Sequence, residues 1–363
     1  MKINRIGEPQ VVMSNPNSKH CYFGWPTVTR LQNGKIAVVA SGFRLRHVCP
    51  FGKTLIAYSE DDGETYTAPA PVIDTVLDDR DGGILPFGDS DVIVTSFNNS
   101  TEFQRSYRRG VDAYTLAYLD TVTEEEEARD LGATFRISHD CGVTFGRLMK
   151  SPVTSPHGPI ALSDGDLLWV GRKFSLNDAV QEDDRIEAYR IHADGEMEYV
   201  GCIDDAVLDG QRLLSCEPPA ILLRDGSILV HIRAQQRGNG QERAFTIFQT
   251  RSRDGGRSWE KPYPILGRTE GSPPHLFRHS SGLLLCTYAD RERPYGIKVM
   301  FSRDEGEHWD TGYDLYVNGV SDDLGYPSTV ECNDGSMLTV FYAHPSAEEP
   351  AVILQQRWKI EEE

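Results

Sequence analysis

The feature that most constrains the fold is an eight-residue pattern that occurs four times along the chain. Its form is Ser-x-Asp-x-Gly-x-[Thr/Ser/His]-aromatic, and the copies begin at Ser59, Ser138, Ser252 and Ser302. In each copy we expect the aspartate to accept hydrogen bonds from nearby backbone N–H groups. We also expect the glycine to adopt a positive φ and the aromatic ring to pack beneath the turn. Such a unit closes a β-hairpin, so four copies predict a chain of repeated hairpins.

A second repeat sets the number of units. A proline and a few apolar residues are followed by a turn, usually Asn-Gly or Asp-Gly, and then by an apolar run. The turn glycines are Gly34, Gly88, Gly165, Gly226, Gly282 and Gly335. Their spacing of about 50 to 80 residues is that of one four-stranded propeller blade. We therefore predict an all-β fold, a single six-bladed β-propeller with four-stranded antiparallel blades over residues 1–363. The third blade keeps only a remnant of the eight-residue pattern, around Ala193-Asp-Gly195.

The interval between Gly88 and Gly165 is the longest and contains the one segment with a helical pattern. Apolar residues recur from Val111 to Leu119, an acidic run covers Glu124–Glu127, and Gly132 is a plausible stop. We predict a helical insertion near residues 111–130 in the second blade. It is either a solvated surface segment or a lid or oligomer contact.

Composition excludes several classes of function. The formal net charge of −18 argues against nucleic acid or an anionic membrane as the main partner. The seven cysteines include no Cys-x-x-Cys pair, which favours reduced thiols. With no apolar stretch of about 18 residues and no signal-peptide run, we expect a cytoplasmic protein. No motif indicates a metal, a nucleotide or another cofactor, so none is expected, and the oligomeric state is left open.

Several polar residues stand where blades begin or where inner strands end, and in a propeller such positions meet near the axis. Glu217 opens the fourth blade in Ser-Cys-Glu-Pro-Pro, and we expect Arg233 to end the first strand of that blade. Tyr326 opens the sixth blade. Arg291 and Arg293 follow the first strand of the fifth.

Together these motifs resemble the sialidase-like β-propellers of the neuraminidase superfamily, in which the eight-residue pattern is the Asp box or BNR repeat. In that family a blade-opening Glu is followed sixteen residues later by an Arg that binds the sugar carboxylate, as Arg233 follows Glu217. The family's nucleophilic Tyr precedes the last Asp-Gly turn by eight residues, as Tyr326 precedes Asp334. A further carboxylate-binding Arg matches Arg293 or Arg291.

The resemblance implies an exo-acting glycoside hydrolase for an acidic or modified terminal sugar. Tyr326 would be the nucleophile, Glu217 its base, and Arg233 with Arg293 the anion clamp. The chemistry is consistent, because a sialoside carries a carboxylate on its anomeric carbon and would repel an anionic nucleophile. A neutral tyrosine activated by a glutamate avoids that repulsion.

The sequence also departs from the family. The first blade normally opens Arg-Ile-Pro but reads Gly24-Trp25-Pro26 here, and the Glu that braces the missing Arg is absent from Val340–Ala343. The acid/base Asp of the first-blade loop is missing as well. His47 and, from the next blade, Asp79 or Asp81 could replace it, and we favour Asp81.

Other candidates can be read as binding residues or as structural ones. Arg44, Arg46 and His47 form a basic loop that can contact substrate or lie in solvent, and Arg80 adjoins Asp81. His157 and His275 open blades and can bind sugar hydroxyls or serve the core. We expect the aspartates of the four Asp boxes to be structural.

Two other classes of function stay open. The missing Arg and Asp are compatible with a non-catalytic glycan-binding propeller. A lyase or an inverting hydrolase in the same pocket would depend on His47, His157 or Asp81 instead of Tyr326. In each case the expected partner is a carbohydrate.

Overall fold

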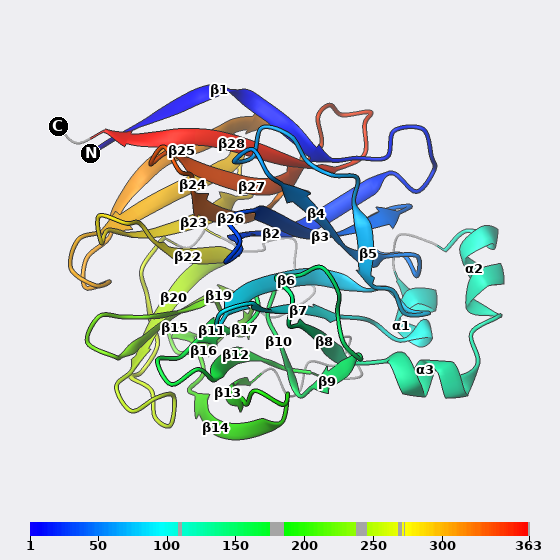
Figure 1. Ribbon diagram of the computed structural model, residues 1–363, viewed down its shortest axis with the longest axis horizontal. Helices are drawn as coiled ribbons and strands as arrows, with labels where there is room; N and C mark the ends of the chain where they lie inside the picture. Colours follow the sequence, from blue (N-terminus) through cyan, green and yellow to red (C-terminus); the bar gives the residue numbers. More distant parts are fainter. Residues whose placement is uncertain (108–110, 175–184, 237–244, 268–270, 272, 362–363) are drawn as a thin grey trace.

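The computed structural model describes residues 1–107, 111–174, 185–236, 245–267, 271 and 273–361. Its strands form six small antiparallel sheets that close into a ring (Figure 1). The predicted six-bladed β-propeller is therefore confirmed.

Each blade is one sheet, and its strands are listed from the axis outward. Blade 1 is β2 (Tyr22–Arg30), β3 (Ile36–Arg44), β4 (Lys53–Ser59) and β5 (Ala70–Ile73), and blade 2 is β6 (Arg80–Phe87), β7 (Asp91–Phe97), β8 (Ala133–Ser138) and β9 (Met149–Ser151). Blade 5 is β22 (Pro274–Arg278), β23 (Leu284–Asp290), β24 (Tyr295–Ser302) and β25 (Asp310–Gly319).

Blades 3 and 4 differ because their innermost strand is interrupted. Blade 3 is β10 (Val153–Thr154) and β11 (Ile160–Ala161), then β12 (Leu167–Lys173), β13 (Ile186–Ile191) and β14 (Met197–Ile203). Blade 4 is β17 (Leu214–Cys216) and β18 (Ala220–Leu222), then β19 (Ile228–Gln235), β20 (Phe245–Ser252) and β21 (Tyr263–Pro264). A short hairpin of β15 (Val207–Leu208) and β16 (Gln211–Arg212) connects the two blades.

Blade 6 closes the ring with strands from both ends of the chain. Its members are β26 (Gly325–Glu331), β27 (Met337–Ala343), β28 (Val352–Glu361) and β1 (Lys2–Met13). The pairing of β1 with β28 runs from Lys2 opposite Glu361 to Met13 opposite Ile353. The first strand of the sequence is thus the outermost strand of the last blade.

The hydrophobic core is divided among the interfaces between neighbouring blades. Val39 and Ile56 of blade 1, for example, pack with Val92 and Val94 of blade 2, and all four are at most 5% exposed. Equivalent clusters lie at each of the five remaining interfaces between adjacent blades. Because both faces of each sheet are covered in this way, the strands read as continuous apolar runs.

The four Asp boxes form the turns between third and fourth strands. In the first, the Asp61 carboxylate accepts hydrogen bonds from the Thr65 backbone N–H at 2.8 Å and from the Ser59 hydroxyl at 2.8 Å. Gly63 has a φ of 92°, as the pattern predicts. Each box also contacts the preceding blade. The Tyr66 hydroxyl, for instance, donates to Gln355 of β28 at 2.6 Å. The boxes therefore stabilise the contact between blades as well as their own hairpins.

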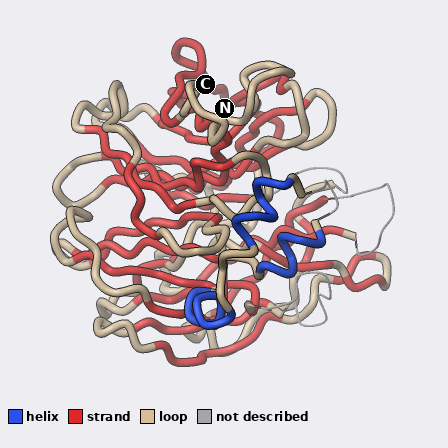
Figure 2. Tube along the Cα trace, turned by 90° about the vertical axis from the view of Figure 1, so that its right-hand side faces the viewer, coloured by secondary structure: helices blue, strands red, loops and turns tan. Residues whose placement is uncertain are grey.

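Three short helices lie between β7 and β8, at one end of the ring (right of Figure 1, facing the viewer in Figure 2). They are α1 (Thr101–Ser106), α2 (Ala113–Leu119) and α3 (Glu124–Asp130). The predicted segment 111–130 thus contains two helices, and Asp112 and Thr123 cap their N-termini. Tyr114 and Tyr118 pack on Phe51, in the loop after β3. No helix in the described ranges is both long and apolar enough to cross a membrane.

Candidate active site

A β-bulge recurs on the innermost strand of four blades and turns one side chain out of the regular alternation. The residues at these bulges are Trp25, Asp81, Glu217 and Tyr326, with φ values of 56°, 52°, 51° and 50°. In each blade the strand pairing skips at this residue. Left-handed backbone at a non-glycine residue costs about 1 to 3 kcal/mol, and such strain is concentrated at functional sites. The repeated bulge marks the axial end of these strands as the candidate site.

Glu217 of blade 4 and Tyr326 of blade 6 are directly bonded. The Tyr326 hydroxyl donates a hydrogen bond to Oε1 of Glu217. Arg233 bonds Oε2 of the same carboxylate at 2.6 Å and lies 3.5 Å from the tyrosine oxygen. The three residues therefore form one cluster. We expected Arg233 on the first strand of its blade, but it lies on the second, β19. The interrupted pair β17–β18 is the innermost strand instead.

The electrostatics of the cluster set the resting protonation states of both residues. Burial raises the pKa of Glu217, but Arg233 and the two hydrogen bonds outweigh it and hold the pKa below its ordinary value. Burial and the negative charge of Glu217 raise the pKa of Tyr326 well above its usual range. The glutamate is therefore ionised and the tyrosine neutral, as a base and a nucleophile awaiting activation must be.

Asp81 is a second carboxyl group close to Tyr326. Its side chain is only 7% exposed, and burial raises its pKa to about 7, although Arg80 acts in the opposite direction. Asp81 Oδ1 and Arg80 Nε lie 3.8 Å apart, and neither has a hydrogen-bond partner in the described structure. The negative charges of both Asp81 and Glu217 act on Tyr326. A carboxyl group that titrates near neutral pH beside an ionised one is the arrangement of an acid/base group next to a base.

Asp79, the other acid/base candidate from this segment, faces a different way. Its carboxylate accepts hydrogen bonds from the Thr75 backbone N–H at 2.7 Å and from Asn98 at 3.2 Å. Its pKa is also raised to about 7 by burial. These contacts hold the loop between β5 and β6, so the geometry favours Asp81 for the axial site.

Of the two arginines after β23, the structure brings Arg291 to the site and not Arg293. The guanidinium carbon of Arg291 lies 5.8 Å from the centre of the Tyr326 ring, and its Nε donates to the Leu324 carbonyl at 3.0 Å. Arg293 is exposed and contacts Tyr295. Our preference for Arg293 is therefore not supported by its position. Arg291 follows β23 directly at the axial end, whereas Arg293 lies further along the surface loop.

Aromatic rings fill the place where the family has its first arginine. A Cβ added to Gly24 would lie 3.5 Å from the Tyr22 ring and 3.7 Å from the Tyr342 ring, so the two tyrosines cover this position. Trp25 is 1% exposed, and the guanidinium carbon of Arg80 stacks 4.2 Å from its ring centre. The missing arginine and its missing brace thus correspond to one local rearrangement, in which Arg80 supplies positive charge from the neighbouring blade.

The two arginines of the first-blade loop make structural contacts. Arg44 is fully buried and forms an ion pair with Asp78 at 2.5 Å. Arg46 points toward the insertion and bonds Asp112 at 2.8 Å. Neither is brought to Tyr326, because the carboxylates of Asp78 and Asp112 hold both guanidinium groups elsewhere.

His157 and His275 lie together at the axis. Their ring centroids are 4.8 Å apart, and each bonds an innermost strand of another blade, through Thr27 at 3.1 Å and Ser328 at 3.2 Å. Burial lowers the pKa of His157 to about 3 and that of His275 well below its usual range. These neutral histidines connect the innermost strands of different blades, which supports a structural role for both.

His47 belongs to a cluster that the sequence did not reveal. Asp323 accepts hydrogen bonds from His47 at 2.8 Å, from the hydroxyls of Tyr22 and Tyr342, and from His344 at 3.2 Å. Asp323 lies three residues before Tyr326, and His344 directly follows β27. Their place next to blade-opening and strand-ending residues is the only sequence signal that could have identified them.

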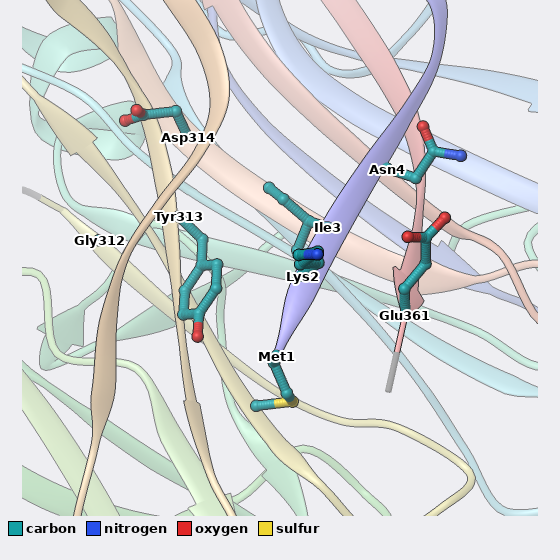
Figure 3. Close-up of a pocket in the computed structure, with 8 residues that line it drawn as sticks. All are labelled: Met1, Lys2, Ile3, Asn4, Gly312, Tyr313, Asp314 and Glu361. Carbon is teal, nitrogen blue, oxygen red and sulfur yellow. The ribbon is translucent and has the colours of Figure 1, made fainter. Parts of the chain in front are cut away.

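Two cavities lie away from the axis. One of about 470 Å³ is lined by Met1–Asn4, Tyr313, Asp314 and Glu361 at the outer edge of blades 5 and 6 (Figure 3). Another of about 710 Å³ lies between blades 3 and 4 and includes Asp166 and Arg190. Neither contains a bulge residue. Among the described residues, no group of three His, Cys, Asp or Glu side chains is placed to bind a metal ion.

Comparisons with known proteins agree with this architecture. The family model described as BNR repeat-like domain matches residues 120–340. A protein of unknown function from Dyadobacter fermentans is 18% identical, with 99% of each chain covered and a TM-score of 0.76. The NanB sialidase of Streptococcus pneumoniae is 12% identical, with 97% of this chain and 70% of that chain covered and a TM-score of 0.68. An α-L-arabinanase of Penicillium chrysogenum is 11% identical, with 96% and 97% covered and a TM-score of 0.61. No curated protein matches the sequence. At these identities the solved structures show the fold alone.

Proposed function

This chain belongs to the family of BNR repeat-like domains, and from that premise we propose that it is a glycoside hydrolase that removes a terminal sugar at the axial site. The observation that carries the proposal is the bond from Tyr326 to Glu217, with Arg233 on the other carboxylate oxygen. The fold that the chain shares with a sialidase and an arabinanase supports it.

The proposed reaction has two steps. In the first, Tyr326 Oη forms a bond to the anomeric carbon and the bond to the leaving-group oxygen breaks. The tyrosine proton passes to Glu217, and protonated Asp81 gives its proton to the leaving oxygen. In the second, ionised Asp81 takes a proton from water, which attacks the anomeric carbon. Tyr326 departs and recovers its proton from Glu217.

The positive charges around the tyrosine support an acidic sugar as substrate. Arg233 and Arg291 lower the pKa of Tyr326, and Arg80 lies close enough for the tyrosine to raise its pKa. Arginine is well suited to binding a carboxylate, because its planar fork donates two parallel hydrogen bonds. A substrate carboxylate near Tyr326 would meet three guanidinium groups.

A panel of 4-nitrophenyl glycosides tests the proposal, with glycosides of N-acetylneuraminic acid, glucuronic acid and arabinofuranose among its members. One member should be hydrolysed, and Tyr326→Phe and Glu217→Gln should each lower kcat by about 100-fold or more. Tyr66→Phe, which removes a partly buried hydroxyl at the periphery, is the control and should retain activity.

Other outcomes would contradict the assignment. Full activity in Tyr326→Phe with loss in Glu217→Gln and Asp81→Asn would favour an inverting reaction of two carboxyl groups. Binding on a glycan array without turnover of any substrate would favour a non-catalytic propeller.

A further inference from the structure

Asp323 holds an imidazole beside the candidate active site in a defined orientation. Nδ1 of His47 lies 2.8 Å from Oδ1 of Asp323 and 3.1 Å from the Tyr22 hydroxyl. That hydroxyl donates to Asp323 at 3.0 and 3.1 Å, so the proton between the ring and the carboxylate is carried by Nδ1. Nε2 is then a hydrogen-bond acceptor. Within the described ranges no protein atom bonds it.

His344, the other imidazole on Asp323, has no such free atom. Its Nδ1 lies 2.7 Å from the Glu349 carbonyl and its Nε2 lies 3.2 Å from Oδ2 of Asp323. Both nitrogens face acceptors, and the hydrogen bond that His344 donates to Asp323 raises the pKa of the imidazole. Asp323 therefore contacts two imidazoles. Both nitrogens of His344 are bonded within the protein, whereas Nε2 of His47 can bind a ligand.

The position of His47 relative to the reaction centre decides what it can contact. Both neighbour the ring of Trp25, whose centroid lies 5.0 Å from that of His47 and 6.4 Å from that of Tyr326. The His47 side chain is 30% exposed, whereas Asp81 is 7% exposed. An exo-acting site holds the terminal sugar at its buried end, near Asp81. The remainder of the saccharide then extends toward the exposed end of the site, near His47.

We propose that His47, oriented by Asp323, binds a hydroxyl of the leaving group, the part of the saccharide beyond the cleaved bond. This inference rests on the proposed function and assigns a subsite to it. A hydroxyl suits the site because it can donate to Nε2, whereas an ionised carboxylate can only accept. Burial lowers the pKa of His47, which keeps the ring neutral for this contact. Asp323 is a positioning residue, since it acts through the imidazole.

The test compares two substrates that carry the same glycosyl group. One is the 4-nitrophenyl glycoside identified by the panel, and the other is its disaccharide with galactose as the leaving group. In His47→Leu, kcat/KM should fall about 10-fold or more for the disaccharide and stay within about twofold for the aryl glycoside. His47→Gln should recover part of the loss, because its amide oxygen can stand near the place of Nε2. Asp323→Asn should shift the ratio of the two values in the same direction but less.

His344→Gln is the matched control, because it removes the other imidazole from the same carboxylate and should leave the ratio unchanged. Equal losses on both substrates in His47→Leu would overturn the inference while the proposed function stood. If the wild-type protein hydrolyses no member of the panel, the proposed function fails first and the inference falls with it. Thermal unfolding of each variant shows that the comparison is made on folded protein.

Discussion

The guanidinium carbon of Arg291 lies 5.8 Å from the centre of the Tyr326 ring, and its Nη2 lies 3.3 Å from the Tyr342 hydroxyl. Arg293, two residues later, is exposed and contacts Tyr295 instead. Both arginines match the family's carboxylate-binding arginine in sequence, but only Arg291 lies next to the proposed reaction centre. The difference can be measured directly.

Arg291→Met should raise KM for an acidic glycoside by about 10-fold or more, because charge-assisted hydrogen bonds contribute about 1.5 to 3 kcal/mol. Arg293→Met should change KM by less than about twofold. Steady-state kinetics of the two variants provides the comparison. Equal effects would mean that the loop after β23 moves when substrate binds and that the geometry described here does not select between them.

The pH dependence of kcat should reflect Asp81. With its pKa raised to about 7, Asp81 is protonated below neutrality and can donate a proton, and it loses that proton as the pH rises. Activity should therefore decline above pH 7. On the acid side it should persist below the ordinary pKa of a glutamate, because the pKa of Glu217 is lowered and Glu217 stays ionised.

Asp79→Asn is the control for this assignment, because its pKa is also raised to about 7 but its bonds go to Thr75 and Asn98. The decline above pH 7 should disappear in Asp81→Asn and remain in Asp79→Asn. The reverse result would assign the titration to the loop between β5 and β6.

The contact between an Asp box and the preceding blade should be visible in stability. Gly63 and Gly34 both have a positive φ, of 92° and 85°. A Cβ on Gly63 would collide with Leu338 of blade 6, whereas a Cβ on Gly34 would meet no atom within 4 Å. Gly34→Ala should lower the free energy of unfolding by about 1 kcal/mol, the cost of the backbone alone. Gly63→Ala should lower it by about 1 to 3 kcal/mol more. Urea unfolding measures both, and equal losses would show that the box does not depend on the neighbouring blade.

The largely buried pair of Arg233 and Glu217 should show strong coupling. Their side chains are 12% and 16% exposed and lie 2.6 Å apart. Breaking a buried pair costs about 3 to 5 kcal/mol because the remaining charge loses its partner. Arg233→Met and Glu217→Gln should each be destabilising, and the double variant should be less destabilised than their sum by about 1 to 3 kcal/mol. Additive losses in urea unfolding would remove the energetic link between the two residues.

The architecture was predictable because its signals are local and repeated. An Asp box specifies its own hydrogen bonds, as Asp61 shows, so four copies could be recognised without any knowledge of what they pack against. The insertion was predicted only in part, because the caps at Asp112 and Thr123 divide it into separate short helices.

The site was harder to predict because its contacts depend on ring closure. Glu217 and Tyr326 could be selected since each opens a blade, yet their contact spans 109 residues. Arg44 looked as suitable as Arg80 from sequence. The choice between them depends on the folded chain, in which Asp78 pairs with Arg44 at 2.5 Å but lies 3.9 Å from Arg80. Asp323 escaped notice because its partners His47 and His344 come from two different blades.

The outermost position of Lys2–Met13, paired with Val352–Glu361, has a consequence for biosynthesis. A ribosome makes β1 more than 300 residues before its partner β28. Until β28 emerges, the blade that bears the tyrosine lacks its two outer strands. A nascent chain therefore contains most residues of the reaction centre before they can assemble into a folded site. Activity should arise only after β28 has been synthesised.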